Sequence, residues 1–245
     1  MSVRPSATPG VKAHFLIKRR PEAAREELVA NWFANHMPAV ISAMNAAAER
    51  GRPAARRYIA TLFGPGRDGA HVWDGVAQLW FDQAPPRPDP PHGTEPADTF
   101  QQKAEPYVPW STTEYVVIDG SEHLPVVPNT LNAPFPCTRS GFHKVTFLVA
   151  AQPDADPGAL FDHWLDAHAP NVREVMGQVG GFRYVVSQSL EPHVEPFVGM
   201  AELYFPGIDE WKGFLSRIGP DGFERFTDAE RTVVLHSEMD MVGIP

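Results

Sequence analysis

Hydrophobic and polar positions in the first half of the chain predict a strand, a helix and three further strands. An apolar run bounded by proline covers residues 13–18, as expected for a strand. In residues 28–36 apolar side chains recur at intervals of three and four, which is helical spacing. Runs rich in β-branched and aromatic residues follow at 58–63 and 76–81, and a last strand is expected at 114–118.

The second half repeats this plan. It has an apolar run at 145–150, a helical segment, β-like runs at 184–187 and 200–205, and a last strand at 232–236. A second helical segment is clearest here, around residues 209–218. The expected order of elements is β-α-β-β-α-β, the split βαβ plan.

Matching motifs relate the two halves directly. The string W-x-x-x-H-x-P occupies residues 32–38 and 164–170, an offset of 132. The related strings GVAQLWF and GMAELYF occupy residues 75–81 and 199–205, an offset of 124. Because the offset changes only between motifs, as loop deletions would produce, we interpret the chain as a tandem duplication.

Proline marks where the copies differ and where they join. The 245 residues include 26 prolines, several of them in the stretch APPRPDPP at residues 84–91. This stretch cannot be helical, so the first copy is expected to lack part of its second helix. We expect a first repeat at residues 11–120, a proline-rich connection at 121–141 and a second repeat at 142–245.

The two motifs, in this order after a strand, resemble the EthD family of the dimeric α/β-barrel superfamily. The second copy is the fuller match, since residues 223–228 are similar to the family's acidic tail, whereas residues 107–111 of the first copy depart from it. The resemblance implies an α+β fold in which two ferredoxin-like βαββαβ repeats form one intrachain dimeric-type α/β barrel. Helices would lie outside, with a ligand cavity between the sheets. Relatives include cofactor-free decarboxylases, cyclases and oxygenases, so the resemblance indicates fold more closely than chemistry.

Strand alternation separates two classes of position. Positions that are apolar in both copies, such as Phe15 and Leu79, are expected to pack under the helices. Positions that differ between the copies are expected to point into the barrel and form an amphipathic lining for a small, partly apolar ligand. We expect this lining to contain His14, Gln78, Trp80, Thr146, Met200, Glu202 and Tyr204.

Two of these residues are candidates for proton transfer. Desolvation inside an apolar barrel would raise the pKa of Glu202 and make it a general base near neutral pH. The alternatives are an ion pair of Glu202 with Lys144 or Arg183, or a position of Glu202 near the barrel mouth, in water. His14 is a candidate because the equivalent position in the second copy holds Thr146. A difference between equivalent interior positions would make the two ends of the cavity chemically different. The alternative is that His14 is exposed to water at the end of its strand.

His36 and His168 lie one helical turn after a tryptophan, on the apolar face of each helix. One of them could shuttle protons, because imidazole titrates near neutrality. Alternatively, each is a hydrogen-bonded residue that fixes the helix against the sheet. Trp32 and Trp164 fit a core role better than a ligand platform.

The remaining histidines give little support for a catalytic, metal or haem site. His71 and His92 are expected at the surface. His163 and His168 are five residues apart and should point in different directions on a helix, which makes them a poor metal pair. Haem held by one histidine, as in the chlorite dismutase-like proteins of the superfamily, is a weaker alternative, because nothing here resembles their haem motif.

Composition argues against several classes of partner and site. The net charge of −9 makes nucleic acid an unfavourable partner. A single cysteine, Cys137, excludes an intrachain disulfide and a cysteine-rich zinc site, and fits a reducing compartment. The N-terminus has no apolar signal region and no run could span a membrane, so we expect a soluble cytoplasmic protein.

These observations favour a cofactor-independent enzyme that acts on a small aromatic or polyketide-like metabolite. The reaction would be a proton transfer such as decarboxylation, dehydration or cyclisation, in the manner of a lyase or a cofactor-free oxygenase. The alternative is a non-catalytic binding or accessory protein for a hydrophobic metabolite. No cofactor or metal is expected, and the protein could be a monomer or a homodimer of barrels.

Overall fold

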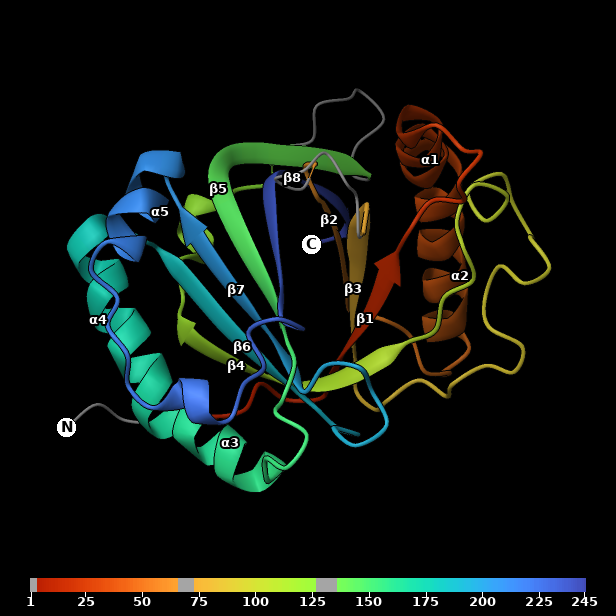
Figure 1. The fold of residues 1–245 in the computed structure, drawn as a ribbon. Helices are drawn as coiled ribbons and strands as arrows, with labels where there is room; N and C mark the ends of the chain where they lie inside the picture. The colour runs from red at the N-terminus through yellow and green to blue at the C-terminus, as the bar shows by residue number, and fades with distance from the viewer. Residues whose placement is uncertain (1–3, 66–72, 127–135) are drawn as a thin grey trace. The chain divides into compact units, whose positions relative to one another are not determined.

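A computed structural model describes residues 4–65, 73–126 and 136–245 (Figure 1). The first repeat forms β1 (Val11–Ile17), α1 (Arg25–Asn31), the π-helix η1 (Trp32–His36), α2 (Met37–Glu49), β2 (Arg57–Leu62), β3 (Gly75–Phe81) and β4 (Trp110–Ile118). After the 3-10 helix η2 (Ser121–His123), the second repeat begins with β5 (Cys137–Val149), α3 (Pro157–His163), the π-helix η3 (Trp164–His168) and α4 (Ala169–Val179). It continues with β6 (Arg183–Ser189), β7 (Gly199–Phe205), α5 (Ile208–Leu215), the 3-10 helix η4 (Phe223–Arg225) and β8 (Val233–Ile244).

This order confirms an α+β fold built from two repeats of the split βαβ plan. The second repeat has all the expected elements, whereas the described residues of the first repeat form no helix between β3 and β4. The proline-rich stretch at residues 84–91 lies in that gap, where missing N–H groups and fixed φ angles prevent a helix.

Each long helix contains a π-helical turn that the sequence pattern did not predict. In η1 the N–H of Met37 reaches back five residues to the carbonyl of Trp32, and η3 repeats this between Ala169 and Trp164. A proline follows each turn, at Pro38 and Pro170. Because proline has no N–H and its ring crowds the carbonyl four residues back, a wider turn relieves the clash.

The segment expected to connect the repeats contains secondary structure at both of its ends. Strand β5 begins at Cys137, inside the segment expected to be a linker, and η2 adds a helical turn. Arg139 at the start of β5 explains the extra length, since both Nε and Nη2 of its guanidinium donate to Oδ2 of Asp240 in β8, at 3.0 and 2.9 Å. The part of the connection at residues 127–135 lies outside the described residues.

The chain divides into two compact units that exchange strands. Among the described residues, the first unit contains 10–65, 73–111, 125–126, 136–140 and 239–245, and the second contains 4–9, 112–124 and 141–238. The strand order is β1-β3-β2-β8 in the first unit and β5-β7-β6-β4 in the second. Each sheet therefore takes its fourth strand from the other repeat, with β8 antiparallel to β2 and β4 antiparallel to β6.

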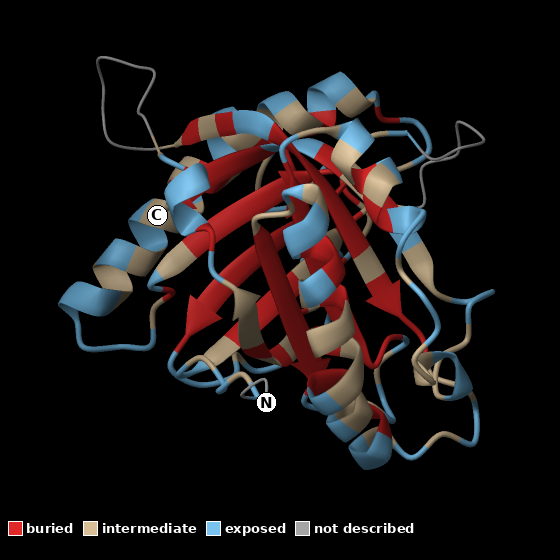
Figure 2. Ribbon diagram, turned by 90° about the vertical axis from the view of Figure 1, so that its left-hand side faces the viewer, coloured by how far each residue is buried: buried red, intermediate tan, exposed pale blue. Residues whose placement is uncertain are grey.

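Each unit packs its helices on one face of its own sheet. Figure 1 shows α1 and α2 beside β1 and β3, and α3 and α4 beside β6 and β7. In Figure 2 the strands are largely buried, while the outer faces of the helices are exposed. The tryptophan of each W-x-x-x-H-x-P motif is completely buried, which confirms the expected core role.

A glycine makes room for each of these tryptophans. A Cβ at Gly75 would lie 3.0 Å from the ring of Trp32 and 2.6 Å from the carbonyl oxygen of Thr61. At Gly199 the corresponding distances, to Trp164 and to the Ser187 carbonyl, would be 2.8 and 2.6 Å. The glycine that opens both GxA motifs is thus required by close helix–sheet packing.

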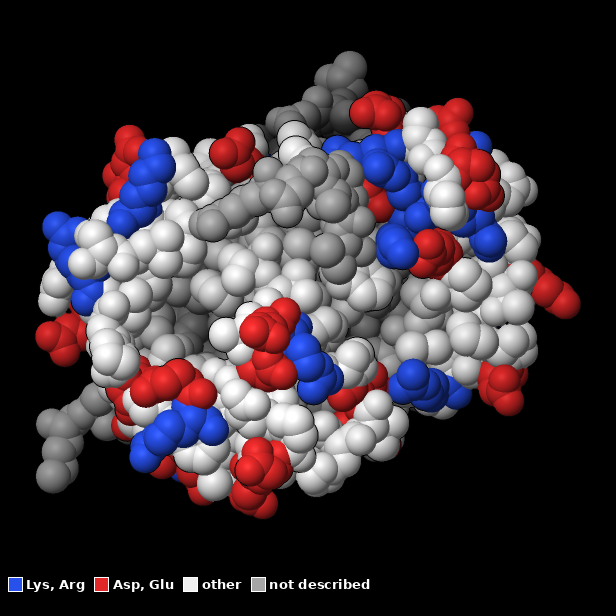
Figure 3. All heavy atoms as spheres, in the orientation of Figure 1, with Lys and Arg blue, Asp and Glu red and all other residues white. Residues whose placement is uncertain are grey.

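Two properties of the surface bear on partners. On the face drawn in Figure 3, basic and acidic side chains lie next to one another instead of gathering by sign. A polyanion therefore meets no continuous basic surface on that face. Among the described helices, none has the length and apolar character needed to cross a membrane.

Candidate functional site

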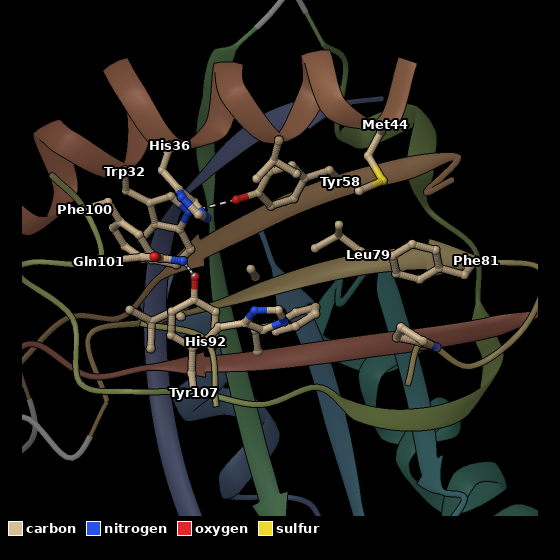
Figure 4. Close-up of a pocket in the computed structure, with 15 residues that line it drawn as sticks. Trp32, His36, Met44, Tyr58, Leu79, Phe81, His92, Phe100, Gln101 and Tyr107 are labelled. Atoms are coloured by element: carbon tan, nitrogen blue, oxygen red, sulfur yellow. Dashed lines mark hydrogen bonds between the residues drawn. The ribbon is translucent and has the colours of Figure 1, made fainter. Parts of the chain in front are cut away.

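Each unit contains a cavity between its helices and its sheet, and we call these the first and the second pocket. The first pocket has a volume of about 350 Å³, and its walls include Phe15, Trp32, His36, Tyr58, Leu79, Phe81, His92, Phe100, Gln101 and Tyr107 (Figure 4). The second pocket has a volume of about 380 Å³, and its walls include Phe147, Trp164, His168, Tyr184, Leu203, Trp211, Phe214, Leu215, Phe223, Thr227 and Val234. Both volumes lie in the range of about 300–1,000 Å³ that is typical of small-molecule sites.

His36, at the wall of the first pocket, is paired with an aspartate. Nδ1 of His36 lies 2.6 Å from Oδ2 of Asp98, whose other oxygen accepts the backbone N–H of Gln101 at 2.8 Å. The ring of Phe100 lies 4.4 Å from the imidazole, centroid to centroid. A carboxylate on Nδ1 favours the tautomer with its proton there, which leaves the Nε2 lone pair of His36 for a ligand.

The second pocket repeats this arrangement. Nδ1 of His168 lies 2.8 Å from Oδ2 of Asp221, and the Phe223 ring stacks on the imidazole at 4.2 Å. The side chain of Asn171 also donates to Oδ2 of Asp221 at 2.8 Å. Burial alone would raise the pKa of Asp221, but the hydrogen bonds from His168 and Asn171 outweigh burial and hold this pKa well below its usual range.

The back walls of the two pockets also match. Nε1–H of Trp32 donates to the Tyr58 hydroxyl at 2.8 Å, and Nε1–H of Trp164 donates to Tyr184 at 3.3 Å. Burial raises the pKa of both tyrosines, so they are neutral at physiological pH. These pairs fix the helices against the sheets and form walls beside each imidazole.

The sequence interpretation missed the aspartates and the stacked phenylalanines. Asp98 and Phe100 match Asp221 and Phe223 at an offset of 123 residues. The string D-x-F was therefore visible in both copies. It was overlooked because the segment after β3 in the first copy is full of proline and otherwise unlike its counterpart.

The predicted orientation of His163 and His168 was wrong. Both imidazoles face Asp221, since Nε2 of His163 lies 3.8 Å from its Oδ1. Both rings also stack on Phe223. The π-helical turn η3 is the cause, because its wider turn brings residues five apart toward one side of the helix.

The predicted catalytic residues separate into two groups. His36 and His168 line the pockets, whereas His14 and Glu202 are on the strand faces turned away from them. His14 is completely buried, with Nδ1 3.3 Å from Nε2 of Gln78, and is not exposed at the strand end. Glu202 forms a buried ion pair with Nζ of Lys144 at 2.6 Å, which is one of the alternatives that the sequence left open.

The predicted substrate-binding residues share the strand faces of His14 and Glu202. In the first unit, Trp80 lies beneath the cations of Lys12 and Arg57, at 4.9 and 5.1 Å from its ring centroid. In the second unit, Thr146 and Met200 are buried, and the ring of Tyr204 lies 4.9 Å from Nζ of Lys144. None of the seven predicted lining residues is among the described walls of either pocket; these are Gln78, Trp80, Thr146, Met200, Tyr204, His14 and Glu202. Their role in substrate binding stays a prediction.

Two further histidines were expected at the surface. His92 is an exposed residue, but its ring also lines the first pocket, 5.6 Å from that of Tyr107. Burial and, to a smaller extent, the nearby His36 lower its pKa. His71 lies outside the described residues.

Haem fits neither pocket. Each pocket offers an imidazole, but among its described walls there is no lysine or arginine to pair with the two propionates of the group. A buried carboxylate without such a partner is strongly unfavourable. Nor do the described residues contain a cluster of three His, Cys, Asp or Glu side chains that could hold a metal ion.

Several solved structures are similar to this chain over most of its length. An anthrone oxidase-like protein is 9% identical, with a TM-score of 0.55 over 96% of this chain and 94% of that chain. A chlorite dismutase variant from Candidatus Nitrospira defluvii is 8% identical, with a TM-score of 0.46 over 94% and 91%. A haem-binding protein from Thermus thermophilus is 12% identical, with a TM-score of 0.42 over 99% and 94%. At these identities the first similarity shows a shared fold and no more.

The sequence itself matches one family model. A search of curated proteins finds no match, whereas the model of the EthD domain matches residues 152–230. This segment runs from the end of β5 through the second pocket to the start of β8, and it contains His168, Asp221 and Phe223. The resemblance inferred from the motifs is confirmed for the second repeat, where residues 152–230 match the model of the EthD domain.

Proposed function

We propose that the protein is a cofactor-independent enzyme that moves a proton on a small aromatic or polyketide-like molecule bound under the helices of a repeat. The observation that carries this proposal is an imidazole–carboxylate pair at the wall of an apolar cavity, present in both units. Decarboxylation, dehydration and cyclisation each need such a proton transfer.

The geometry supports histidine as the base. In each pair the carboxylate orients the ring through Nδ1 and stabilises the imidazolium that forms when Nε2 takes a proton. Aromatic walls would hold a flat ligand against the imidazole and exclude water, which strengthens electrostatic interactions in the cavity. Glu202 is a weaker candidate because Lys144 already neutralises it.

A non-catalytic binding protein is the second candidate, and the second pocket favours it. Besides His168, three polar side chains at its walls each make a hydrogen bond within the protein: Tyr184 accepts from Trp164, Thr227 donates to the Phe223 carbonyl and Thr232 accepts from Ala150 N–H. Two residues at its walls, Leu215 and Val234, are exposed apolar side chains. Such a cavity could hold a hydrophobic metabolite without changing it.

The experiment compares wild type with His36→Ala, His168→Ala and the double variant. Each protein is incubated with a panel of aromatic acids and ketones, and products are identified by mass spectrometry. We expect turnover by the wild type and a loss of about 100-fold or more in the double variant, because general base catalysis contributes about 10²–10⁴-fold. Turnover that survives both substitutions would remove histidine from the mechanism. Ligands recovered bound but unchanged, even at stoichiometric protein, would favour the binding protein.

A further inference from the structure

The first pocket contains a second group able to move a proton, the hydroxyl of Tyr107. This residue precedes β4, and reciprocal backbone hydrogen bonds of 3.0 Å hold it against His92. Its ring contacts Phe15 edge-on at 6.1 Å, so the tyrosine forms part of the wall that faces β1. Figure 4 shows its hydroxyl pointing toward Gln101, on the side of the pocket where Phe100 lies.

Hydrogen bonding orients the Tyr107 hydroxyl as a donor. The side-chain oxygen of Gln101 accepts the N–H of Ala97 at 2.8 Å, which assigns the amide nitrogen to the other side. That nitrogen donates to the oxygen of Tyr107 at 3.2 Å. The tyrosine oxygen is thus an acceptor in the only hydrogen bond found for it among the described residues, and its own proton is available to a ligand.

His36 and Tyr107 flank the same aromatic ring. Phe100 lies 4.4 Å from the imidazole of His36 and 6.2 Å from the ring of Tyr107, centroid to centroid. Asp98, which pairs with His36, is also close enough to influence Tyr107 electrostatically. Burial, followed by that carboxylate, raises the pKa of Tyr107 to about 12, so the phenol keeps its proton at physiological pH.

The segment that covers the second pocket contributes no tyrosine, and the phenol among the described walls there is that of Tyr184, at the back beside Trp164. At the offset of 123 residues that relates Phe100 to Phe223, Tyr107 corresponds to Glu230, which is exposed in a turn. Gln101 corresponds to Glu224, whose carboxylate is occupied with the N–H of Gly222. The space is filled instead by Trp211 and Phe214 of α5.

From this pairing of base and donor, we propose that the first pocket is an enolisation site for an aromatic ketone. This inference rests on the proposed function and specifies its substrate class and the repeat that performs the reaction. The donor suits a carbonyl oxygen, since a neutral phenol binds a developing enolate oxygen more strongly than the ketone oxygen. The apolar walls suit the fused ring of an aryl ketone.

The reaction step is a reversible proton transfer. Nε2 of His36 takes a proton from the carbon next to the carbonyl, and the electron pair of that C–H bond forms a carbon–carbon double bond. The π pair of the carbonyl moves onto oxygen, which the O–H of Tyr107 stabilises. Return of a proton from the His36 imidazolium to carbon restores the ketone, so atoms and electrons balance without an oxidant.

Deuterium exchange tests this step without knowledge of the natural substrate. The probe is 1-tetralone in D₂O, with the loss of its α-proton signal followed by ¹H NMR. Wild type should exchange these protons faster than buffer alone. His36→Gln should lose about 100-fold or more of this rate, and Tyr107→Phe about 10- to 100-fold. Tyr115→Phe and His123→Gln are matched control variants outside both pockets, and should exchange at the wild-type rate.

Binding is measured on the same samples by saturation-transfer NMR, and folding by thermal unfolding. Tetralone that binds the wild type but exchanges no faster than in buffer overturns the enolisation site and leaves the binding role intact. Absence of binding overturns the aromatic ketone as the substrate class. Exchange that is lost in His168→Gln but kept in His36→Gln would assign the step to the second pocket and overturn the proposal. Exchange at the wild-type rate in a folded Tyr107→Phe protein would contradict the role of the Tyr107 hydroxyl as the hydrogen-bond donor to the enolate oxygen.

Discussion

The two pockets share one framework and differ in what covers it. Each has a buried tryptophan that donates a hydrogen bond to a tyrosine. Each also has a histidine that is paired with an aspartate and packs against a phenylalanine ring. The first pocket is covered by a loop that brings in Gln101 and Tyr107, whereas the second is covered by helix α5 with Trp211 and Phe214. Duplication therefore preserved the parts that hold helix to sheet, while the covering segment set the polarity of each cavity.

This difference separates positioning from chemistry. The shared framework orients an imidazole toward a cavity in both units, and does not by itself supply a second proton-transfer group. In the first pocket the cover adds one, the hydroxyl of Tyr107, whereas the cover of the second pocket adds no tyrosine among the described residues. Residues that are the same in two repeats thus report on folding first, and residues that differ are better guides to specificity.

The largest effect is expected from removing the shared tryptophan. Trp32→Ala and Trp164→Ala should each lower the free energy of unfolding by about 3–5 kcal/mol, because each ring is completely buried and leaves a large void. Urea unfolding of both variants measures this. Losses that differ by more than about 2 kcal/mol would show that the two frameworks are not energetically equivalent.

The Asp221→Asn variant should have a smaller, pH-dependent effect. The pKa of Asp221 is lowered in the folded protein, so the ionised carboxylate stabilises the fold above the unfolded pKa of about 3.9, and this contribution is lost as the pH falls toward the folded value. The substitution should cost about 1–3 kcal/mol at pH 7. At about pH 2.5 it should cost less. Urea unfolding at both pH values checks this, and an equal loss at the two would contradict the role of the charge.

The smallest effect is expected where the second framework has an extra histidine. His163 corresponds to Asn31 in the first repeat, at the offset of 132 residues. Its approach to Asp221 is long, at 3.8 Å, so His163→Asn should reduce stability by about 1 kcal/mol or less. Chemical denaturation beside His168→Asn tests the ranking. A loss as large as that of His168→Asn would make His163 an equal partner of the carboxylate.

The sequence predicted the local elements because their signals are local. Apolar spacing located the helices and strands of both repeats, and the prolines at 84–91 predicted the missing helix of the first. The same rules failed at Trp32–His36 and Trp164–His168, where a regular helical repeat was assumed and a π-helix formed. Consequently His163 was assigned to the wrong side of its helix.

The site was predicted in part for the same reason. His36 and His168 were found from a motif within one helix. Their partners Asp98 and Asp221 lie 62 and 53 residues further along the chain, in segments with weak periodicity. The alternating strand positions were sorted correctly into two faces, but the pockets lie on the face that had been interpreted as core alone.

By itself, the sequence determined that the chain is a duplicated βαββαβ protein with an EthD-like second half, because repetition and periodicity are properties of neighbouring residues. Only the tertiary structure decided which carboxylate meets which imidazole, and that each sheet takes its last strand from the other repeat. Those choices depend on packing and hydrogen bonding between segments far apart in the chain, where glycines fit the tryptophans and buried groups such as Arg139 and Asp240 must find partners. The chemistry of the first pocket depends on the same long-range packing, since it places Tyr107 and His36 around one ring.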